Sequence, residues 1–173
     1  MINLAKAVKE VAYLEGDFTT RSGKKTSYYI DKYRFETKPY ILKEIAAQIA
    51  RKLPDSKKYD YLAAPELGGV AIAAAVSIAV NKPFLIVRKK SKGYGTANLI
   101  EGPYTENQTA IMLEDVITTG GAVLTACDIL KENKIHVTHI ITVIDREEGA
   151  SETIESNGYT IDRLLTTSDL KNA

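Results

Sequence analysis

A short apolar run followed by two acids, two threonines and two glycines occupies residues 110–122, with the sequence AIMLEDVITTGGA. Its apolar part, residues 110–113, predicts a buried strand of a parallel sheet, and Glu114 and Asp115 follow at the end of that strand. Apolar side chains then recur at helical spacing in residues 123–130. The segment therefore predicts a strand, an acidic pair, a tight turn and a helix, which is the turn of a βα unit.

The turn at Thr118, Thr119, Gly120 and Gly121 is typical of an anion site. The first backbone N–H groups of a helix have no intrahelical partner and carry the positive end of the helix dipole. Glycine lets the backbone approach an anion closely. The neighbouring acids repel a bare phosphate but accept hydrogen bonds from hydroxyl groups, so the pattern favours a sugar phosphate. The alternative is a strand that ends in solvated acids before an ordinary turn.

Strands and helices alternate along most of the chain. The sequence predicts helices over residues 4–16, 39–53, 68–80, 122–132 and 147–156, a hairpin around 22–24, and strands over 59–64, 83–88, 110–113, 137–145 and 160–165. Repeated βα units predict an α/β fold with a mostly parallel central sheet flanked by helices. Ligands bind at the carboxyl ends of the strands in such sheets, where Glu66, Arg88, Glu114 and Arg146 fall.

The composition limits the class of partner. With 23 basic and 22 acidic residues among 173, the net charge of +1 argues against a nucleic acid or an anionic membrane. The length suits one domain. Cys127 is the only cysteine, which excludes an intrachain disulfide and fits a reducing cytoplasm. Charges interrupt the N-terminal segment, so we expect no signal peptide, and no apolar run approaches the length of a membrane span.

A long connection follows the strand that ends at Arg88. It opens with Lys89, Lys90 and Lys92 and contains glycines that allow movement. Connections of this length are uncommon in compact domains unless they form a lid, a binding loop or a disordered segment. Residues 89–108 therefore suit a flexible lid that closes over a polyphosphate and excludes water. The alternative is a solvated surface loop.

Two further strand ends carry candidate residues. The segment PELGG at residues 65–69 offers a second backbone anion site, or its glycines serve close packing. Arg146, in the segment DREEG, either pairs with its acidic neighbours or grips a carboxylate or pyrimidine edge through its planar fork. His136, His139 and Cys127 show no spacing typical of a metal site or an activated nucleophile, so we expect structural roles for them.

Four segments together resemble one protein family. The run AIMLEDVITTGGA is similar to the phosphoribosyl-pyrophosphate (PRPP) signature of the type I phosphoribosyltransferases. FTTRSGKKTSYYID, RKKSKGYG and DREEG resemble the hood, the catalytic loop and the base-binding segment of the orotate phosphoribosyltransferases. The resemblance implies a type I phosphoribosyltransferase fold in a single domain over residues 1–173. Residues 1–36 would form a small N-terminal helix and hood hairpin, and residues 37–173 a βα core with the lid at 89–108.

The resemblance also implies roles for individual residues. Lys92 and Asp115 are the implied catalytic residues, and Arg21, Thr118 and Arg146 the implied orotate-binding residues. The chain has Arg21 and Gly68 where lysines are frequent in the family, and Tyr94 where histidine is usual. Tyr28 and Tyr29 either lie in the core of the hood, which the sequence favours, or cover the base. The implied PRPP-binding residues are Arg88, Lys89, Lys92, Tyr94, Glu114, Asp115, Val116, Ile117, Thr118, Thr119, Gly120, Gly121 and Ala122.

The implied reaction transfers 5-phosphoribosyl from PRPP to orotate, giving orotidine 5′-monophosphate and pyrophosphate in pyrimidine (UMP) biosynthesis. It uses magnesium that is held mainly through PRPP, with no metal site built from protein side chains. The resemblance further implies a homodimer in which the lid of one subunit reaches the PRPP site of its partner. Two alternatives stay open: a purine or other nucleobase phosphoribosyltransferase, and a non-catalytic PRPP-sensing regulator of the same fold. An intact basic lid argues against the regulator.

Overall fold

A mostly parallel sheet forms the centre of the molecule. The computed structural model describes residues 2–19, 23, 25–89 and 98–173. The six-stranded sheet has the order β5-β4-β3-β6-β7-β8, and only β5, at the edge, runs antiparallel to its neighbour. This arrangement confirms the predicted α/β fold. The strands are β3 (Tyr61–Pro65), β4 (Phe84–Val87), β5 (Ile100–Glu101), β6 (Thr109–Ile117), β7 (His136–Asp145) and β8 (Thr160–Thr166).

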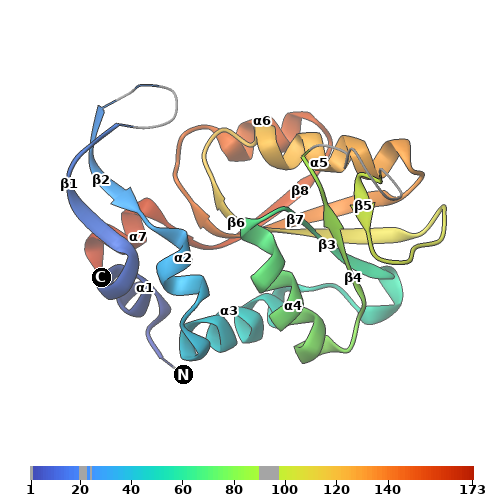
Figure 1. Cartoon of the computed structure of the whole chain (residues 1–173), viewed down its shortest axis with the longest axis horizontal. Coiled ribbons are helices and arrows are strands. Elements are labelled where there is room, and N and C mark those ends of the chain that lie inside the picture. The colour runs from blue at the N-terminus through green and yellow to red at the C-terminus, as the bar shows by residue number, and fades with distance from the viewer. Residues whose placement is uncertain (1, 20–22, 24, 90–97) are drawn as a thin grey trace.

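Helices cover both faces of this sheet. In Figure 1, α3 (Pro39–Lys52) and α4 (Gly68–Val80) lie below the sheet, and α5 (Gly121–Glu132) and α6 (Ala150–Ser156) lie above it. Pro39 begins α3 at a position where a helix needs no N–H donor, which agrees with the predicted start. The βα connections return each strand to the same direction, so the strands present their carboxyl ends at one edge.

The N-terminal segment forms the hood beside the sheet. Strands β1 (Tyr13–Thr19) and β2 (Lys25–Ile30) pair antiparallel in a separate two-stranded sheet, which confirms the predicted hairpin. Helix α1 (Leu4–Ala12) precedes the hairpin and packs against the C-terminal helix α7 (Thr167–Asn172), as Figure 1 shows. A short helix, α2 (Lys32–Glu36), connects the hairpin to α3.

The hydrophobic core forms one cluster on each face of the sheet. Alternate residues of β6 enter different clusters: Leu113 packs with the α3 and α4 side, and Met112 with the α5 and α6 side. Leu4 and Val8 of α1 belong to the first cluster and are buried there. Full burial of one such aliphatic side chain contributes about 1.5–3 kcal/mol. Helix α1 is therefore anchored in the main core.

Strand β6 extends beyond the predicted residues 110–113. Glu114 and Asp115 lie inside the strand, because its pairing with β7 continues as far as Ile117. The prediction that the two acids follow the end of the strand is therefore wrong. Their side chains project from backbone that is fixed by a central ladder of hydrogen bonds.

Other boundaries also differ from the prediction. The first helix ends at Ala12, since Tyr13 already pairs with Ile30 in the hairpin. The helix predicted over 147–156 begins at Ala150. Part of the connection at 89–108 forms β5, and two short helices, α2 and α7, were not expected from the sequence. None of the helices in the described part of the chain has both the length and the hydrophobicity needed to cross a membrane.

Candidate active site

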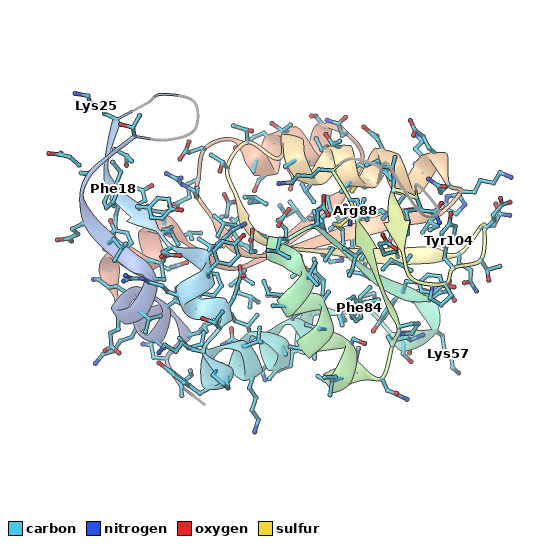
Figure 2. The ribbon with its side chains drawn as sticks, viewed as in Figure 1. Phe18, Lys25, Lys57, Phe84, Arg88 and Tyr104 are labelled. Carbon is cyan, nitrogen blue, oxygen red and sulfur yellow. The ribbon has the colours of Figure 1, made fainter. Side chains whose placement is uncertain are left out.

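The candidate residues meet at one edge of the sheet. Glu66, Arg88 and Arg146 lie just beyond the carboxyl ends of β3, β4 and β7, and Asp115 lies inside the parallel strand β6 near its carboxyl end. Figure 2 shows Arg88 beyond β4 near the middle of the molecule, whereas Lys25 lies far out on the hairpin. The topology therefore brings together residues that are widely separated in the sequence.

Two buried acids form the floor of this edge. Glu114 is 8% exposed and Asp115 is 2% exposed. Burial raises the pKa of the Glu114 carboxyl well above its usual value, and the adjacent Asp115 raises it further. The Asp115 N–H donates to Glu114 Oε1 at 3.1 Å, and the Val116 N–H donates to Asp115 Oδ1. Backbone donors of β6 therefore orient both carboxyls.

Helix α2 places a cation and a third acid against this pair. Lys32 Nζ lies 2.5 Å from Asp115 Oδ2. Burial alone would lower the pKa of the Lys32 ammonium, but the hydrogen bond and charge of Asp115 outweigh it, and the pKa is raised. Glu36 is 4% exposed, and burial together with Asp115 raises its pKa to about 8. At neutral pH the Glu36 carboxyl is therefore protonated.

The loop after β6 lines a small cavity of about 160 Å³, together with Glu114 and the first residues of α5. Gly120 has a φ of 84°, a left-handed conformation that glycine adopts without strain. Helix α5 begins at Gly121, so its first N–H groups border this cavity. A larger hollow of about 500 Å³ lies on the hairpin, lined by residues 17–19 and 25–27. Size alone does not identify the site.

Two glycines allow α4 to begin against the acidic pair. A Cβ on Gly69 would lie 2.7 Å from the Leu113 carbonyl oxygen. A Cβ on Gly68 would lie 1.6 Å from Asp115 Oδ2 and 2.5 Å from Lys32 Nζ. Close packing therefore requires both glycines of the segment at 65–69. The same packing brings the start of α4, with its free N–H groups, next to Asp115.

Arg146 lies between the end of β6 and the hood. Its N–H donates to the Ile117 carbonyl oxygen at 3.0 Å. Its side chain is 16% exposed, and Nη2 lies 3.1 Å from Glu148 Oε1. The same Nη2 donates to the Tyr28 hydroxyl at 3.4 Å, and the guanidinium carbon lies 5.4 Å from the centre of the Tyr28 ring. Arg146 thus pairs with an acidic neighbour and also contacts the hood.

Arg88 borders the site at the end of β4. Its Nη1 lies 3.4 Å from Glu66 Oε2 and 3.9 Å from Glu101 Oε1. The Lys89 N–H donates to Glu66 Oε1 at 3.0 Å. Glu66 therefore ties the first residues of the predicted lid to the end of β3.

The predicted site residues separate into three sets. Glu114 and Asp115 lie beside the loop of residues 116–122, while Arg88, Lys89 and Arg146 lie on either side of them. The remaining predictions, Arg21, Lys92 and Tyr94, concern residues outside the described part of the chain.

Three residues make contacts in the site that no local sequence pattern predicts. Lys32 and Glu36 belong to a helix of five residues, too short for a periodic pattern to predict. Tyr28 is expected in the hood core or over the base, with the core favoured, and its hydroxyl and ring contact Arg146. Tyr29 is 48% exposed, so its predicted place in that core is wrong. These contacts join residues far apart in the sequence, and local patterns do not record them.

Cys127 and His139, for which structural roles stay predictions, lie in α5 and β7. Cys127 is buried in α5, and burial raises the pKa of its thiol to about 12, so it stays protonated at neutral pH. His139 Nε2 lies 3.0 Å from Asp162 Oδ2. Within the described ranges, no group of three or more His, Cys, Asp or Glu residues is arranged to hold a metal ion.

Comparison with known proteins identifies the family. Residues 35–162 match the family model of the phosphoribosyl transferase domain. The chain is 47% identical over 161 residues to the orotate phosphoribosyltransferase of Pyrococcus abyssi, covering 91% of this chain and 87% of that protein. It is 44% identical to the orotate phosphoribosyltransferase of Pyrococcus horikoshii, covering 100% of this chain and 92% of that protein. The chain belongs to the orotate phosphoribosyltransferase family.

Solved structures of this family share the fold. The orotate phosphoribosyltransferase of Aeropyrum pernix superimposes with a TM-score of 0.85 at 27% identity, covering 98% of this chain and 96% of that chain. The Mycobacterium tuberculosis enzyme in complex with PRPP gives a TM-score of 0.81 at 29% identity, covering 97% and 96%. The assignment to the type I phosphoribosyltransferase fold and to the orotate phosphoribosyltransferases is therefore confirmed.

Proposed function

We propose a role for each residue at this edge of the sheet in the orotate phosphoribosyltransferase reaction. The enzyme transfers 5-phosphoribosyl from PRPP to orotate, giving orotidine 5′-monophosphate and pyrophosphate in pyrimidine (UMP) biosynthesis. One observation supports the assignment most directly: the 3.0 Å hydrogen bond from the Arg146 N–H to Ile117. It joins a cation that suits orotate to the loop that suits the ribose phosphate.

The ribose-phosphate side of the site consists of Glu114, Asp115 and the loop of residues 116–122. The 5′-phosphate would accept hydrogen bonds from the first N–H groups of α5 and from the hydroxyls of Thr118 and Thr119. The acids would accept hydrogen bonds from the ribose hydroxyls. On this side the proposed PRPP-binding residues are Glu114, Asp115, Val116, Ile117, Thr118, Thr119, Gly120, Gly121 and Ala122.

The pyrophosphate of PRPP would lie toward β3 and β4. Arg88 borders this region, and Lys89 continues into the lid. We assign Lys92 and Tyr94 of the lid to the same pyrophosphate, with Lys92 as the catalytic cation. The N–H groups at the start of α4 supply further donors there.

The base side of the site consists of Arg146 and Tyr28, with Arg21 of the hood and Thr118 as further contacts to orotate. An arginine fork matches a carboxylate or a pyrimidine edge through paired hydrogen bonds. Arg146 is positioned for this, since it adjoins the end of β6 through Ile117.

The bond between ribose C1 and pyrophosphate breaks with separation of charge. Positive charge develops on the ribose, where the Asp115 carboxylate lies, and negative charge develops on the leaving group, where Lys92 would lie. One opposite charge about 4 Å away contributes about 4 kcal/mol at an effective dielectric of about 20. Asp115 and Lys92 are therefore the proposed catalytic residues.

The carboxyls of the site suit a magnesium ion held mainly through PRPP. Asp115 is paired with Lys32, Glu66 is paired with Arg88, and Glu114 is buried with a raised pKa. Magnesium keeps several waters and commonly binds through substrate phosphates with few protein carboxylates. When bound, it would neutralise charge on the pyrophosphate.

Assembly and location follow the family resemblance. We propose a homodimer in which residues 89–108 of one subunit close over the PRPP site of the other, with residues 1–36 as the hood and 37–173 as the core of a single domain. The single cysteine, which is free and buried, suits a cytoplasmic protein. Small molecules, PRPP and orotate, are the proposed ligands.

Release of pyrophosphate from PRPP, measured with a panel of bases, tests the activity. Orotate should support release, while adenine, guanine, hypoxanthine and uracil should not. Preference for a purine would favour the nucleobase alternative. PRPP binding without turnover on any base would favour the PRPP-sensing regulator.

A mixture of two inactive variants tests the shared site. Lys92→Ala and Asp115→Asn each remove a group from opposite sides of the proposed subunit boundary. If the lid acts on the partner, each mixed dimer contains one fully intact site, and random exchange restores about a quarter of the wild-type activity. No recovery after verified subunit exchange, with both parents folded and dimeric, would exclude the shared site.

A further inference from the structure

Helix α2 turns two side chains toward one carboxylate. Lys32 and Glu36 are four residues apart, so they share one face of the helix. Lys32 Nζ lies 2.5 Å from Asp115 Oδ2, and the buried Glu36 carboxyl lies near enough to Asp115 for that carboxyl to raise the pKa of Glu36. Phe35 is completely buried and anchors α2 in the core. Helix α2 therefore contacts Asp115 although it belongs to a different part of the chain from β6 and α5.

Gly68 leaves the space that this contact needs. A Cβ at this position would overlap Asp115 Oδ2 at 1.6 Å and would lie 2.5 Å from Lys32 Nζ. Gly68 does not adopt a positive φ, so its backbone conformation would accept any residue. The requirement for glycine comes from the volume that the ion pair of Lys32 and Asp115 occupies.

Three carboxyls lie around this ammonium. Glu36 and Glu114 both have a raised pKa, first because they are buried and then because Asp115 is near. Asp115 is the carboxylate that Lys32 contacts directly. The cluster therefore favours protons on the two glutamates. The titratable groups that face this cluster are Asp31, Lys32, Tyr33, Glu36, Glu114 and Asp115.

We propose that Lys32 is a positioning residue for PRPP: its ammonium holds the Asp115 carboxylate in one orientation, ready to accept hydrogen bonds from the ribose hydroxyls. This inference rests on the proposed role of Asp115. Lys32 acts through Asp115 and not on the reacting atoms. Its side chain is 32% exposed, so the amine can move aside when PRPP arrives while still balancing the buried charge.

Removal of the ammonium has a definite consequence. Without Lys32, Asp115 Oδ2 loses the partner that lies 2.5 Å away, and the carboxylate can turn from its present orientation. A carboxylate in another orientation directs its acceptor lone pairs away from the ribose hydroxyls. The loss should therefore appear in the use of PRPP and leave the contact between Arg146 and orotate in place.

The first test replaces Lys32 with methionine, which keeps the length of the side chain and removes the charge. We expect kcat/KM for PRPP to fall about 10- to 100-fold, the range typical for groups that orient a functional residue. The KM for orotate at saturating PRPP should change less than about twofold. Lys43→Met, an exposed lysine on α3, is the matched control and should behave like the wild type.

The second test separates a role of the charge from a role in packing. Lys32→Ala leaves a partly exposed hole that n-propylammonium can enter. At constant ionic strength, this amine should restore activity to Lys32→Ala in a saturable way, while tetramethylammonium, which cannot donate a hydrogen bond, should not. Lys32→Met, whose side chain fills the hole, should not respond to either ion.

The outcomes distinguish this inference from the proposed function. Wild-type kinetics in a folded Lys32→Met protein, or no amine rescue of a folded and impaired Lys32→Ala protein, would overturn the role of Lys32. If Asp115→Asn also behaves like the wild type, the role proposed for Asp115 fails as well. As a third variant, Gly68→Ala should lower kcat/KM for PRPP, because its methyl group displaces the ion pair. Unchanged kinetics in Gly68→Ala would count against the inference.

Discussion

The two sides of the active site are built in different ways. On the ribose-phosphate side, Asp115 is 2% exposed and projects from a central strand, with Lys32 and Gly68 packed against it. On the base side, Arg146 reaches Glu148 and the Tyr28 hydroxyl through a long side chain. One side uses short side chains on rigid elements, and the other uses a flexible side chain between the core and the hood.

This difference predicts different kinetic effects on the two sides. A short carboxylate on a central strand is held in place before substrate binds, and such preorganised groups act on the transition state. A guanidinium that exchanges one partner for another adapts to its ligand and contributes mainly to binding. We therefore expect changes on the ribose-phosphate side to lower kcat and changes on the base side to raise the KM for orotate.

The largest effect is expected for Asp115→Asn, which removes charge beside the ribose and adds almost no volume. Loss of one well-placed electrostatic group costs about 10²–10³ in rate, so kcat should fall by that factor. Steady-state kinetics would measure it, with thermal unfolding to verify the fold. Asp128→Asn, on the exposed face of α5, is the control. A change of less than about twofold would make the acid pair structural, because that is well under 1 kcal/mol.

Arg146→Ala should have the next largest effect, and it should act on orotate alone. Hydrogen bonds from a charged group contribute about 1.5–3 kcal/mol, so kcat/KM for orotate should fall about 10- to 100-fold. Calorimetry with PRPP and magnesium should give the same PRPP affinity for Arg146→Ala as for the wild type. Arg51→Ala, on α3, is the control. Loss of PRPP affinity in a folded Arg146→Ala protein would contradict the division into two sides.

The ribose-phosphate side is largely predictable from the sequence because it is contiguous. Strand β6, its two acids, the loop and the start of α5 follow one another within residues 109–122. Apart from the end of the strand, the local patterns in this segment agree with the tertiary structure, and the βα alternation places it at the carboxyl edge of the sheet. The error lies in the end of β6, where pairing with β7 keeps Glu114 and Asp115 inside the strand.

The partners of these residues are not predictable in the same way. Lys32 contacts Asp115, and Tyr28 contacts Arg146, although each pair is far apart in the sequence. Neither contact has a local pattern, since α2 has five residues and Tyr28 lies in a hairpin strand whose alternation is equally typical of a core position. The requirement for glycine at position 68 is likewise not predictable from the sequence. Only the structure shows which atoms occupy the space beside Gly68.

Glu36→Gln tests the electrostatics of the ribose-phosphate side through stability. Folded Glu36 keeps its proton up to a pKa of about 8, whereas the unfolded chain releases it near the ordinary value of 4.5. The folded state therefore binds more protons in this window, and stability falls as the pH rises, by at most about 1.4 kcal/mol per pH unit for this group. Glutamine cannot ionise, so the variant should lose less stability than the wild type between pH 6 and pH 8.

Thermal unfolding at several pH values measures the slope for Glu36→Gln. Glu114 also has a raised pKa, so the variant should keep part of the slope. Glu132→Gln, at the exposed end of α5, should follow the wild type. Equal slopes in Glu36→Gln and the wild type would mean that Glu36 is ionised in the folded protein at neutral pH.

The smallest effect is expected for Tyr28→Phe, which removes the hydroxyl that accepts from Arg146 at 3.4 Å and keeps the ring 5.4 Å from the guanidinium. A hydrogen bond of this kind contributes about 0.5–1.5 kcal/mol, and the long distance places it at the lower end, so the KM for orotate should rise about two- to threefold. Tyr40→Phe, an exposed tyrosine on α3, is the control. If the base side is adaptable, kcat and the affinity for PRPP should stay unchanged, because Arg146 keeps the Tyr28 ring and Glu148 as partners. A fall in kcat as large as that of Asp115→Asn would instead show that the base side is as rigid as the ribose-phosphate side.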